Sequence, residues 1–535
     1  MRRTDMTKDH DSQHDSNASP FVGVFAVIDI GATSVRMMIA QVIADGTIDT
    51  LENLSQAVSL GKDSFIKGFI EKATIEDCVK VLQVYRHKLI NEYGIDESRI
   101  RVVATSAVRE ARNRQAFQDR VFIATGFEIQ PFDEAELHRV TYLGALPFLG
   151  LSGTSDDEQT VICEVGGGST ELIVLKFDRV AFARTYRLGS LRLQKTMETH
   201  HLALSEIRNL MESQINQTVS QIRTVMNLDN PIRLIVMGSD MRLATKKISG
   251  HDPREQLVPI DVADLKKFTN KILAEKPERL IRAYSLSLPE AESLGPALLA
   301  NLLIARGLNA NQVLVANANI RNGLIKEMAF GSLWTHAVET QILQSAFNIG
   351  RKFQVDETHA RHVANLATSI FRQIGGLHQI EPRNELLLHL AALLHEVGLF
   401  VGYRSHHKHA YYIIRNADLF GLGSDDVELV ALISRYHRRA FPQSRHDAYA
   451  RLKRRDRVTV SKMAALLRVA KSLDNSRQQR IQDVHCELKP GQLVLHVASS
   501  SDLTMEEIEL RTQAKLFSEV FGFQITLDRS ARIQK

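Results

Sequence analysis

Two glycine-containing turns, each at the end of an apolar strand, carry the residue types and order that can do chemistry in this chain. The first lies in VFAVIDIGATSVRMMIAQ and holds Asp29, Gly31, Thr33 and Ser34. The second lies in TVICEVGGGSTELIVLKF and holds Glu164, Gly166, Gly167, Gly168 and Ser169. Each pattern predicts a β-hairpin whose turn directs backbone N–H groups and hydroxyls at one spot, a nest that binds phosphate. The carboxylates of Asp29 and Glu164 can hold a hydrated Mg²⁺ or orient a water, so both are predicted metal ligands and Glu164 is also a predicted catalytic residue.

Strands and helices that alternate along the chain must position these turns. The alternation runs over residues 21–145 and returns over about 155–330, where RLIVMGS ends in a third predicted phosphate-binding turn at Gly238 and Ser239. Such alternation predicts two α/β layers. Because each half opens with one hairpin, we expect an internal duplication in which the two turns face each other across a cleft.

The chain changes character after about residue 334. Residues 335–480 show the apolar periodicity of helices and few strand signals, and LVLHVA, IELR and FQITLD predict a small α+β end. Glycines and Trp334 mark the boundary. The predicted divisions are a disordered tail at 1–20, α/β domains at 21–150 and 151–332, and a helical domain at 333–535.

The composition bounds the kind of protein and its surroundings. With 67 basic and 62 acidic residues the net charge is only +5, so any anion-binding surface must be local. Three cysteines without a C-x-x-C pair predict a reducing compartment and no structural zinc. The chain has neither an apolar stretch of about 18 residues nor the apolar core of a signal peptide. We therefore expect a cytoplasmic protein with no membrane partner.

Four motifs, in their order, resemble the exopolyphosphatase and guanosine pentaphosphate phosphohydrolase (Ppx/GppA) family. They are DIGATSVRM, ATSAVREARN, EVGGGSTEL and IRNGL. In addition, LLHEVGLFVGYRSHHKHAYYIIRNADLFGL resembles the HD-like domain attached to many family members. The resemblance spans about residues 24–525. It implies an α/β fold of two actin-like (ribonuclease H-like) domains around a cleft, followed by an all-α HD-like domain with a small α+β end.

The resemblance also implies an activity. The family removes the terminal phosphate of inorganic polyphosphate or the 5′-γ-phosphate of guanosine pentaphosphate, with a divalent cation such as Mg²⁺. Phosphoryl transfer needs charge neutralisation and an in-line water. Arg109 matches an arginine that grips phosphate oxygens, and Glu171 matches a carboxylate that positions water or metal. A kinase of the same fold is less favoured, since the motifs match the hydrolase branch. A homodimer through the C-terminal domain is also implied.

The general base departs from the family pattern. The family has two consecutive glutamates, of which the second activates water, and FDEAELHRVTYLG aligned through Arg139 and Tyr142 places Leu137 there. A leucine cannot accept a proton. We expect Glu136 to have assumed the role, with Glu134 as the alternative. The remaining alternative is a catalytically weak sensor of polyphosphate or nucleotide.

The helical domain carries an altered metal pattern. Metal-dependent HD phosphohydrolases place a histidine, a His-Asp pair and a last aspartate on neighbouring helices. Here the candidates are His362, the pair His395-Glu396 and Asp474, while Lys471 stands at the apparent last position. Because a lysine puts a positive charge where a cation would sit, we expect a metal-free domain.

A basic run follows between Arg435 and Arg457. Its nine Lys/Arg stand at 435, 438, 439, 445, 451, 453, 454, 455 and 457. The ordinary interpretation is a solvated helix face. With phosphate-binding turns in the same chain, a groove for a polyanion is at least as good an interpretation. The predicted polyphosphate-tail residues are Arg451, Lys453, Arg454 and Arg455. Aromatic residues are few and irregularly spaced, so nucleic acid is not an expected partner.

Overall fold

The computed structural model describes residues 21–44, 46–149, 158–198, 204–226, 228, 230–251, 257–330, 336–438, 440–498 and 501–529. The predicted tail at 1–20 and the predicted boundary at Trp334 lie outside the described residues. The chain divides into two compact units, Met1–Gln130 with Ile320–Leu333 and Pro131–Asn319 with Trp334–Lys535.

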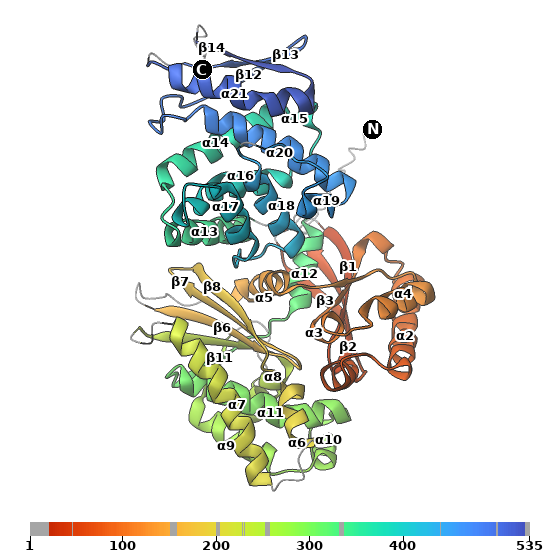
Figure 1. The fold of residues 1–535 in the computed structure, drawn as a ribbon. Coiled ribbons are helices and arrows are strands. Elements are labelled where there is room, and N and C mark those ends of the chain that lie inside the picture. Colours follow the sequence, from red (N-terminus) through yellow and green to blue (C-terminus); the bar gives the residue numbers. More distant parts are fainter. Residues whose placement is uncertain are drawn as a thin grey trace, which may run out of the picture. The chain divides into compact units, whose positions relative to one another are not determined.

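The first unit is built on a five-stranded sheet of order β3-β2-β1-β4-β5. Its strands are β1 (Phe21–Ile30), β2 (Ser34–Ile43), β3 (Ile48–Ala57), β4 (Ile100–Ala104) and β5 (Ile129–Pro131). Strand β1 pairs antiparallel with β2 and parallel with β4, and its residues 25–30 are all buried, as expected for a central strand. Helices α2 (Lys72–His87) and α4 (Arg114–Thr125) pack together, and α12 (Ile320–Ala329) lies against β1 and β2 (Figure 1).

A six-stranded sheet of order β10-β11-β9-β6-β7-β8 forms the α/β part of the second unit. Its strands are β6 (Gln159–Val165), β7 (Thr170–Lys176), β8 (Arg179–Tyr186), β9 (Ile232–Met237), β10 (Val258–Asp261) and β11 (Gln312–Val315). Val161, Cys163 and Leu172 belong to a core shared with the long helices α7 (Leu204–Val225) and α11 (Leu288–Gly307). Since side chains alternate along a strand, Glu164 and Glu171 lie on the other face. Helix α5 (Glu134–Leu149) packs against β7 and β8 (Figure 1).

The remainder of the second unit is mainly helical. Its longer helices are α13 (His336–Lys352), α14 (Glu357–Gln373), α16 (Asn384–Leu394), α17 (His406–Arg415), α18 (Ser424–Arg435) and α20 (Arg454–Ser472). Nearly every residue of α16 is buried, so it is the central helix of this part. The chain ends with α21 (Thr504–Phe521) and a sheet of β12 (His485–Lys489), β13 (Gln492–His496) and β14 (Gln524–Asp528). No helix in the described part is both long and apolar enough to cross a membrane.

Candidate active site

The turn between β1 and β2 is held rigidly by backbone hydrogen bonds. The Gly31 N–H donates to the Ser34 carbonyl at 3.0 Å, which closes the hairpin. The Gly61 N–H donates to the Ala32 carbonyl at 2.8 Å. These two hydrogen bonds hold the backbone of the turn in one conformation. A fixed backbone is what a preformed anion-binding nest requires.

Asp29, the last acid before this turn, is buried. One of its carboxylate oxygens is paired with an arginine, and the other is not hydrogen-bonded within the described part of the chain. Its Oδ2 lies 3.2 Å from Nη1 of Arg321, and the two residues are only 6% and 4% exposed. Its Oδ1 is buried and has no hydrogen-bond partner among the described residues. A buried carboxylate oxygen without a partner fits the predicted role as a ligand of a hard cation or its water.

Arg321 was not among the residues predicted from the sequence. It lies on α12, in the IRNGL motif, about 290 positions from Asp29. The motif was the available signal, but only the tertiary structure assigns its arginine to the acid of the first turn.

The predicted phosphate-facing arginine, Arg109, lies on an element beside the same turn. Strand β4 runs parallel to β1 with Ala104 opposite Ile30. The Thr105 N–H then donates to the Ile30 carbonyl at 3.3 Å, and α3 (Ser106–Arg109) begins there. Parallel pairing therefore brings α3 and the first turn to one edge of the sheet.

The turn between β6 and β7 repeats the closure of the first. The Gly166 N–H donates to the Ser169 carbonyl at 2.8 Å. The Ser190 and Leu191 N–H groups, at the start of α6 (Ser190–Glu198), donate to the carbonyls of Gly166 and Gly167, each at 2.9 Å. The two turns thus share one local geometry. Whether they face each other involves both units and stays a prediction.

The third predicted turn lies at the same sheet edge as the second. Strand β9 runs parallel to β6, with Met237 opposite Glu164. Gly238 follows with φ +119°, a conformation that L side chains rarely adopt, and Ser239 begins α8 (Ser239–Ile248). The structure therefore places Gly238 and Ser239 beside the turn at 166–169.

Two carboxylates lie opposite each other next to the second turn. Glu164 pairs with Glu171 across β6 and β7, and Glu171 is buried and accepts a 2.7 Å hydrogen bond from the Ser169 hydroxyl. Like charges directly opposite one another repel. This arrangement is therefore chemically suited to a cation, as the sequence predicted for Glu164.

The predicted base, Glu136, caps the start of α5. Its N–H donates to Asp133 Oδ1 at 2.9 Å, and its Oε2 accepts from the Asp133 N–H at 3.1 Å. This is a capping box, which fixes the first helical turn. The neighbouring Leu137, at the family's usual base position, is buried. Glu136 is thus held in place at the helix start, next to the position that lost its carboxylate.

A cavity of about 1860 Å³ lies within the second unit, between α5, β8 and the helical part. Glu134 and His138 line one side, and Arg435, Arg445 and Arg451 of the basic run also line it. The other predicted tail residues, Lys453, Arg454 and Arg455, are not among its lining residues, and Arg455 forms an ion pair with Glu381. The structure therefore brings part of the basic run into one cavity with the start of α5.

A row of polar side chains links that cavity to the second turn. Glu171 stands opposite Thr185 on β8, and the Thr185 hydroxyl lies 3.0 Å from Nε2 of His138. No motif in the sequence singled out His138 or Thr185. Their proximity depends on the packing of α5 against the sheet.

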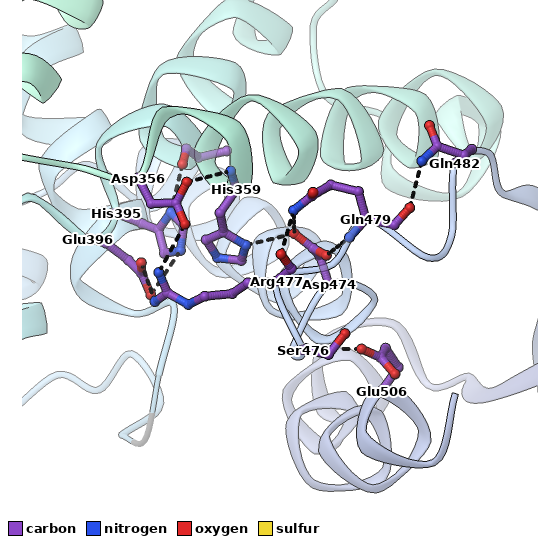
Figure 2. A network of polar contacts seen from close by, with 11 residues as sticks. Asp356, His359, His395, Glu396, Asp474, Ser476, Arg477, Gln479, Gln482 and Glu506 are labelled. Carbon is purple, nitrogen blue, oxygen red and sulfur yellow. Dashed lines mark hydrogen bonds and ion pairs between the residues drawn. The ribbon is translucent and has the colours of Figure 1, made fainter. Parts of the chain in front are cut away.

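A second polar cluster lies in the helical part, and it corrects one expectation. His359, rather than His362, lies with His395 and Glu396, one ligand atom of each being within 4.8 Å of the others (Figure 2). His362 lies one turn further along α14 and is not part of this group. Asp474 accepts a hydrogen bond from His359 instead of standing as a fourth member of the group.

Comparison with known proteins now decides the family. A model of the Ppx/GppA phosphatase family matches residues 38–330, more than half of the chain. The chain belongs to the Ppx/GppA phosphatase family. A model of Ppx/GppA phosphatase domain III also matches residues 343–516. The chain is therefore a member of a phosphatase family, and its helical part matches domain III of that family.

Two relatives of this Ppx/GppA member share less than a quarter of their aligned residues with it. A guanosine-5′-triphosphate,3′-diphosphate pyrophosphatase of Photobacterium profundum is 24% identical over 430 residues, covering 78% of this chain and 81% of that protein. The crystal structure of an exopolyphosphatase from Cytophaga hutchinsonii matches with a TM-score of 0.51 and 19% identity, covering 58% of this chain and 99% of that one. The predicted fold class, two actin-like domains followed by a helical part, is confirmed.

Gly189 offers a test of the second turn in this Ppx/GppA member. A Cβ at Gly189 would overlap the backbone of Gly167 and Gly168, and backbone cannot move aside as a side chain can. Gly189→Ala is therefore expected to lower the free energy of unfolding by about 1–3 kcal/mol. It should also raise the KM for the phosphate substrate. Denaturant unfolding and steady-state phosphate release measure both effects.

The matched control is Gly376→Ala. A Cβ there meets no atom within 4 Å. The control should leave KM unchanged and stabilise the protein by up to about 1 kcal/mol. Equal KM values for the two variants would show that the turn at 166–169 takes no part in binding substrate.

Proposed function

We propose that this phosphatase hydrolyses the terminal phosphoanhydride of inorganic polyphosphate and releases orthophosphate. The observation that carries the proposal is the cavity that Glu134 of α5 shares with Arg435, Arg445 and Arg451. A terminal phosphate needs only the glycine turns. A long chain leaves most of its charge outside them. Arg435, Arg445 and Arg451 can offset part of that charge in a cavity that Asp418, Asp425, Glu428 and Asp447 also line.

Each residue group has a proposed role in this reaction. The two hairpin turns, with Gly238 and Ser239, bind phosphate oxygens through N–H groups and hydroxyls. Arg109 neutralises charge on the transferred group. Glu136 takes the proton of the attacking water, and Glu171 orients that water. Asp29 in the first unit and Glu164 in the second are each a proposed carboxylate ligand for Mg²⁺, which supplies further charge neutralisation when bound.

Two other functions remain as alternatives. Guanosine pentaphosphate presents a similar anhydride, and the Photobacterium relative carries the name of an enzyme acting on such a nucleotide. A catalytically weak sensor is favoured by Leu137, since it occupies the usual base position. Orthophosphate release, measured side by side on long polyphosphate and guanosine pentaphosphate, separates the three. Faster release from polyphosphate supports the proposal, and binding without release supports the sensor.

The basic run should distinguish long from short substrates. Replacing Arg451, Lys453, Arg454 and Arg455 together by glutamine is expected to raise the KM for long polyphosphate strongly. The KM for guanosine pentaphosphate or a short oligophosphate should change little, because the glycine turns alone are proposed to hold these substrates. Added salt should mimic the variant on the long substrate. An equal loss on both substrates would indicate a role in folding or assembly instead.

Single variants show which part of the run matters. Arg451 lines the cavity, whereas Arg455 is paired with Glu381 outside its lining. Arg451→Gln should therefore raise the KM for long polyphosphate more than Arg455→Gln does. The reverse order would place the tail away from the cavity.

A further inference from the structure

The start of α5 carries both carboxylates that were predicted as the base, and a histidine follows them that has no role in the proposed reaction. Glu134 and Glu136 lie in the first turn of the helix. His138 comes four residues after Glu134, so the two share one face of α5, and both line the cavity. The side chain of His138 is nevertheless largely buried, with the residue only 6% exposed.

His138 contacts the edge strand of the second sheet. Its Nε2 lies 3.0 Å from the Thr185 hydroxyl on β8, which is hydrogen-bond distance. Helix α5 packs against β7 and β8, so this bond joins two elements that already touch (Figure 1). Apolar contacts are non-directional, whereas a hydrogen bond weakens steeply when its geometry changes. The bond therefore fixes where along β8 the start of the helix lies.

The position of Thr185 relates this bond to the proposed chemistry. Thr185 stands opposite Glu171 in the pairing of β7 with β8. Residues directly opposite each other on antiparallel strands have Cβ atoms about 4.5–5.5 Å apart. Glu171 is itself fixed, because it is buried and accepts a 2.7 Å hydrogen bond from the Ser169 hydroxyl. His138 thus attaches the helix start to the cross-strand neighbour of the carboxylate that is proposed to orient water.

A hydrogen bond from the helical part supports the same helix start. The Ser424 N–H, at the beginning of α18, donates to Asp133 Oδ2 at 2.6 Å. Asp133 also forms the capping box with Glu136. The first turn of α5 is therefore supported from the helical part through Asp133 and from the sheet through His138. Loss of the bond to Thr185 would remove the support that comes from the sheet.

We propose that His138 is a positioning residue for hydrolysis. Through Thr185 it sets the distance between the start of α5, which carries the base, and Glu171, which orients the attacking water. A displacement of about 1 Å between such groups can cost about 10²-fold in rate. The inference rests on the proposed function in requiring a base at the start of α5. It holds whether Glu136 or Glu134 is that base, and for either phosphoanhydride substrate.

The test removes each partner of the bond in the full chain. Thr185→Val keeps the β-branched shape without the hydroxyl, and His138→Phe keeps a ring without its nitrogens. Each should lower the turnover number by about 10–10²-fold while changing the KM less than about twofold. Thr185→Ser keeps the hydroxyl and should turn over at nearly the wild-type rate. The double variant should be no slower than the slower single variant, because both changes remove the same bond.

Thr141→Val is the matched control on the same helix. It makes the same substitution at a buried threonine whose hydroxyl has no hydrogen-bond partner among the described residues. Its turnover number should equal that of the wild type. Normal turnover in Thr185→Val and His138→Phe would overturn the proposal. An equal loss in Thr185→Ser, or losses that multiply in the double variant, would overturn it as well.

Two further measurements separate this inference from a structural role and from the proposed function. Melting temperatures show which variants are folded at the assay temperature, and Thr185→Val decides alone if His138→Phe does not fold. A lower melting temperature with normal turnover would show a purely structural bond and overturn the proposal. Phosphate release uses whichever of long polyphosphate and guanosine pentaphosphate is cleaved faster. If Glu136→Gln or Glu134→Gln is slow while Thr185→Val is not, the positioning role fails and the proposed base stands.

Discussion

Glu136→Gln is expected to lower the turnover number by about 10²–10⁴-fold, the usual cost of losing a general base. Glutamine keeps the size and polarity of the side chain but cannot accept a proton from water. The KM should stay nearly constant, because the proposed phosphate-binding groups are untouched. Pre-steady-state and steady-state phosphate release on polyphosphate measure both quantities.

The structure indicates that this substitution should change catalysis without changing the stability of α5. Glu136 also caps α5 through the Asp133 N–H, and glutamine serves equally well in a capping box. The melting temperature should therefore not fall, so lost activity cannot be attributed to a frayed helix. Glu134→Gln, two residues earlier, is the control and should have little effect. A near-normal rate in Glu136→Gln would move the role to Glu134 or Glu171. An inert wild type would favour the sensor.

Asp29→Ala is expected to reduce both stability and activity. The change leaves Arg321 buried without the carboxylate that lies 3.2 Å from it. Removing one partner of a buried ion pair typically costs about 3–5 kcal/mol. Activity should fall as well if Asp29 holds Mg²⁺, and raising the Mg²⁺ concentration should not restore it. Urea unfolding and phosphate release over a Mg²⁺ series provide the measurements.

A double variant separates the two effects. The double variant Asp29→Ala/Arg321→Met removes both charges of the buried ion pair. Most of the lost free energy of unfolding should therefore be recovered. Activity should not return, because the free Oδ1 of Asp29 is still missing. Recovery of activity in the double variant would show that Asp29 serves only to neutralise Arg321.

Local patterns in the sequence predicted the two hairpins. Acid, glycine and hydroxyl residues between β-branched runs determine strand, turn and strand over about 20 positions, and the structure has both turns with the same closing hydrogen bond. The fold class followed from the order of the motifs rather than from any one of them. These features depend on neighbours in the sequence, and for that reason they were predictable.

Features that depend on distant residues were not predictable in the same way. The pairing of Arg321 with Asp29, and of His138 with Thr185, exists only because separate elements pack together. By contrast, Asp133 and Glu136 are spaced as a capping box, which is a local pattern that the sequence itself carries. The sequence predicted His362 in the helical cluster, but His359 belongs there, because the sequence does not tell which turn of α14 lies beside His395.

Helix α12 belongs to the first unit although it follows the second sheet in the sequence, and this order affects how the chain can fold during synthesis on the ribosome. Residues 320–329 are made after the whole six-stranded sheet, yet they supply the arginine that accompanies Asp29. A nascent chain that stops before residue 320 contains the first glycine hairpin with its aspartate uncompensated. Domains generally fold as they emerge, but this one must wait for almost 200 further residues. Incomplete products should therefore be recognised by proteases as unfolded, and they would not accumulate as fragments that bind phosphate.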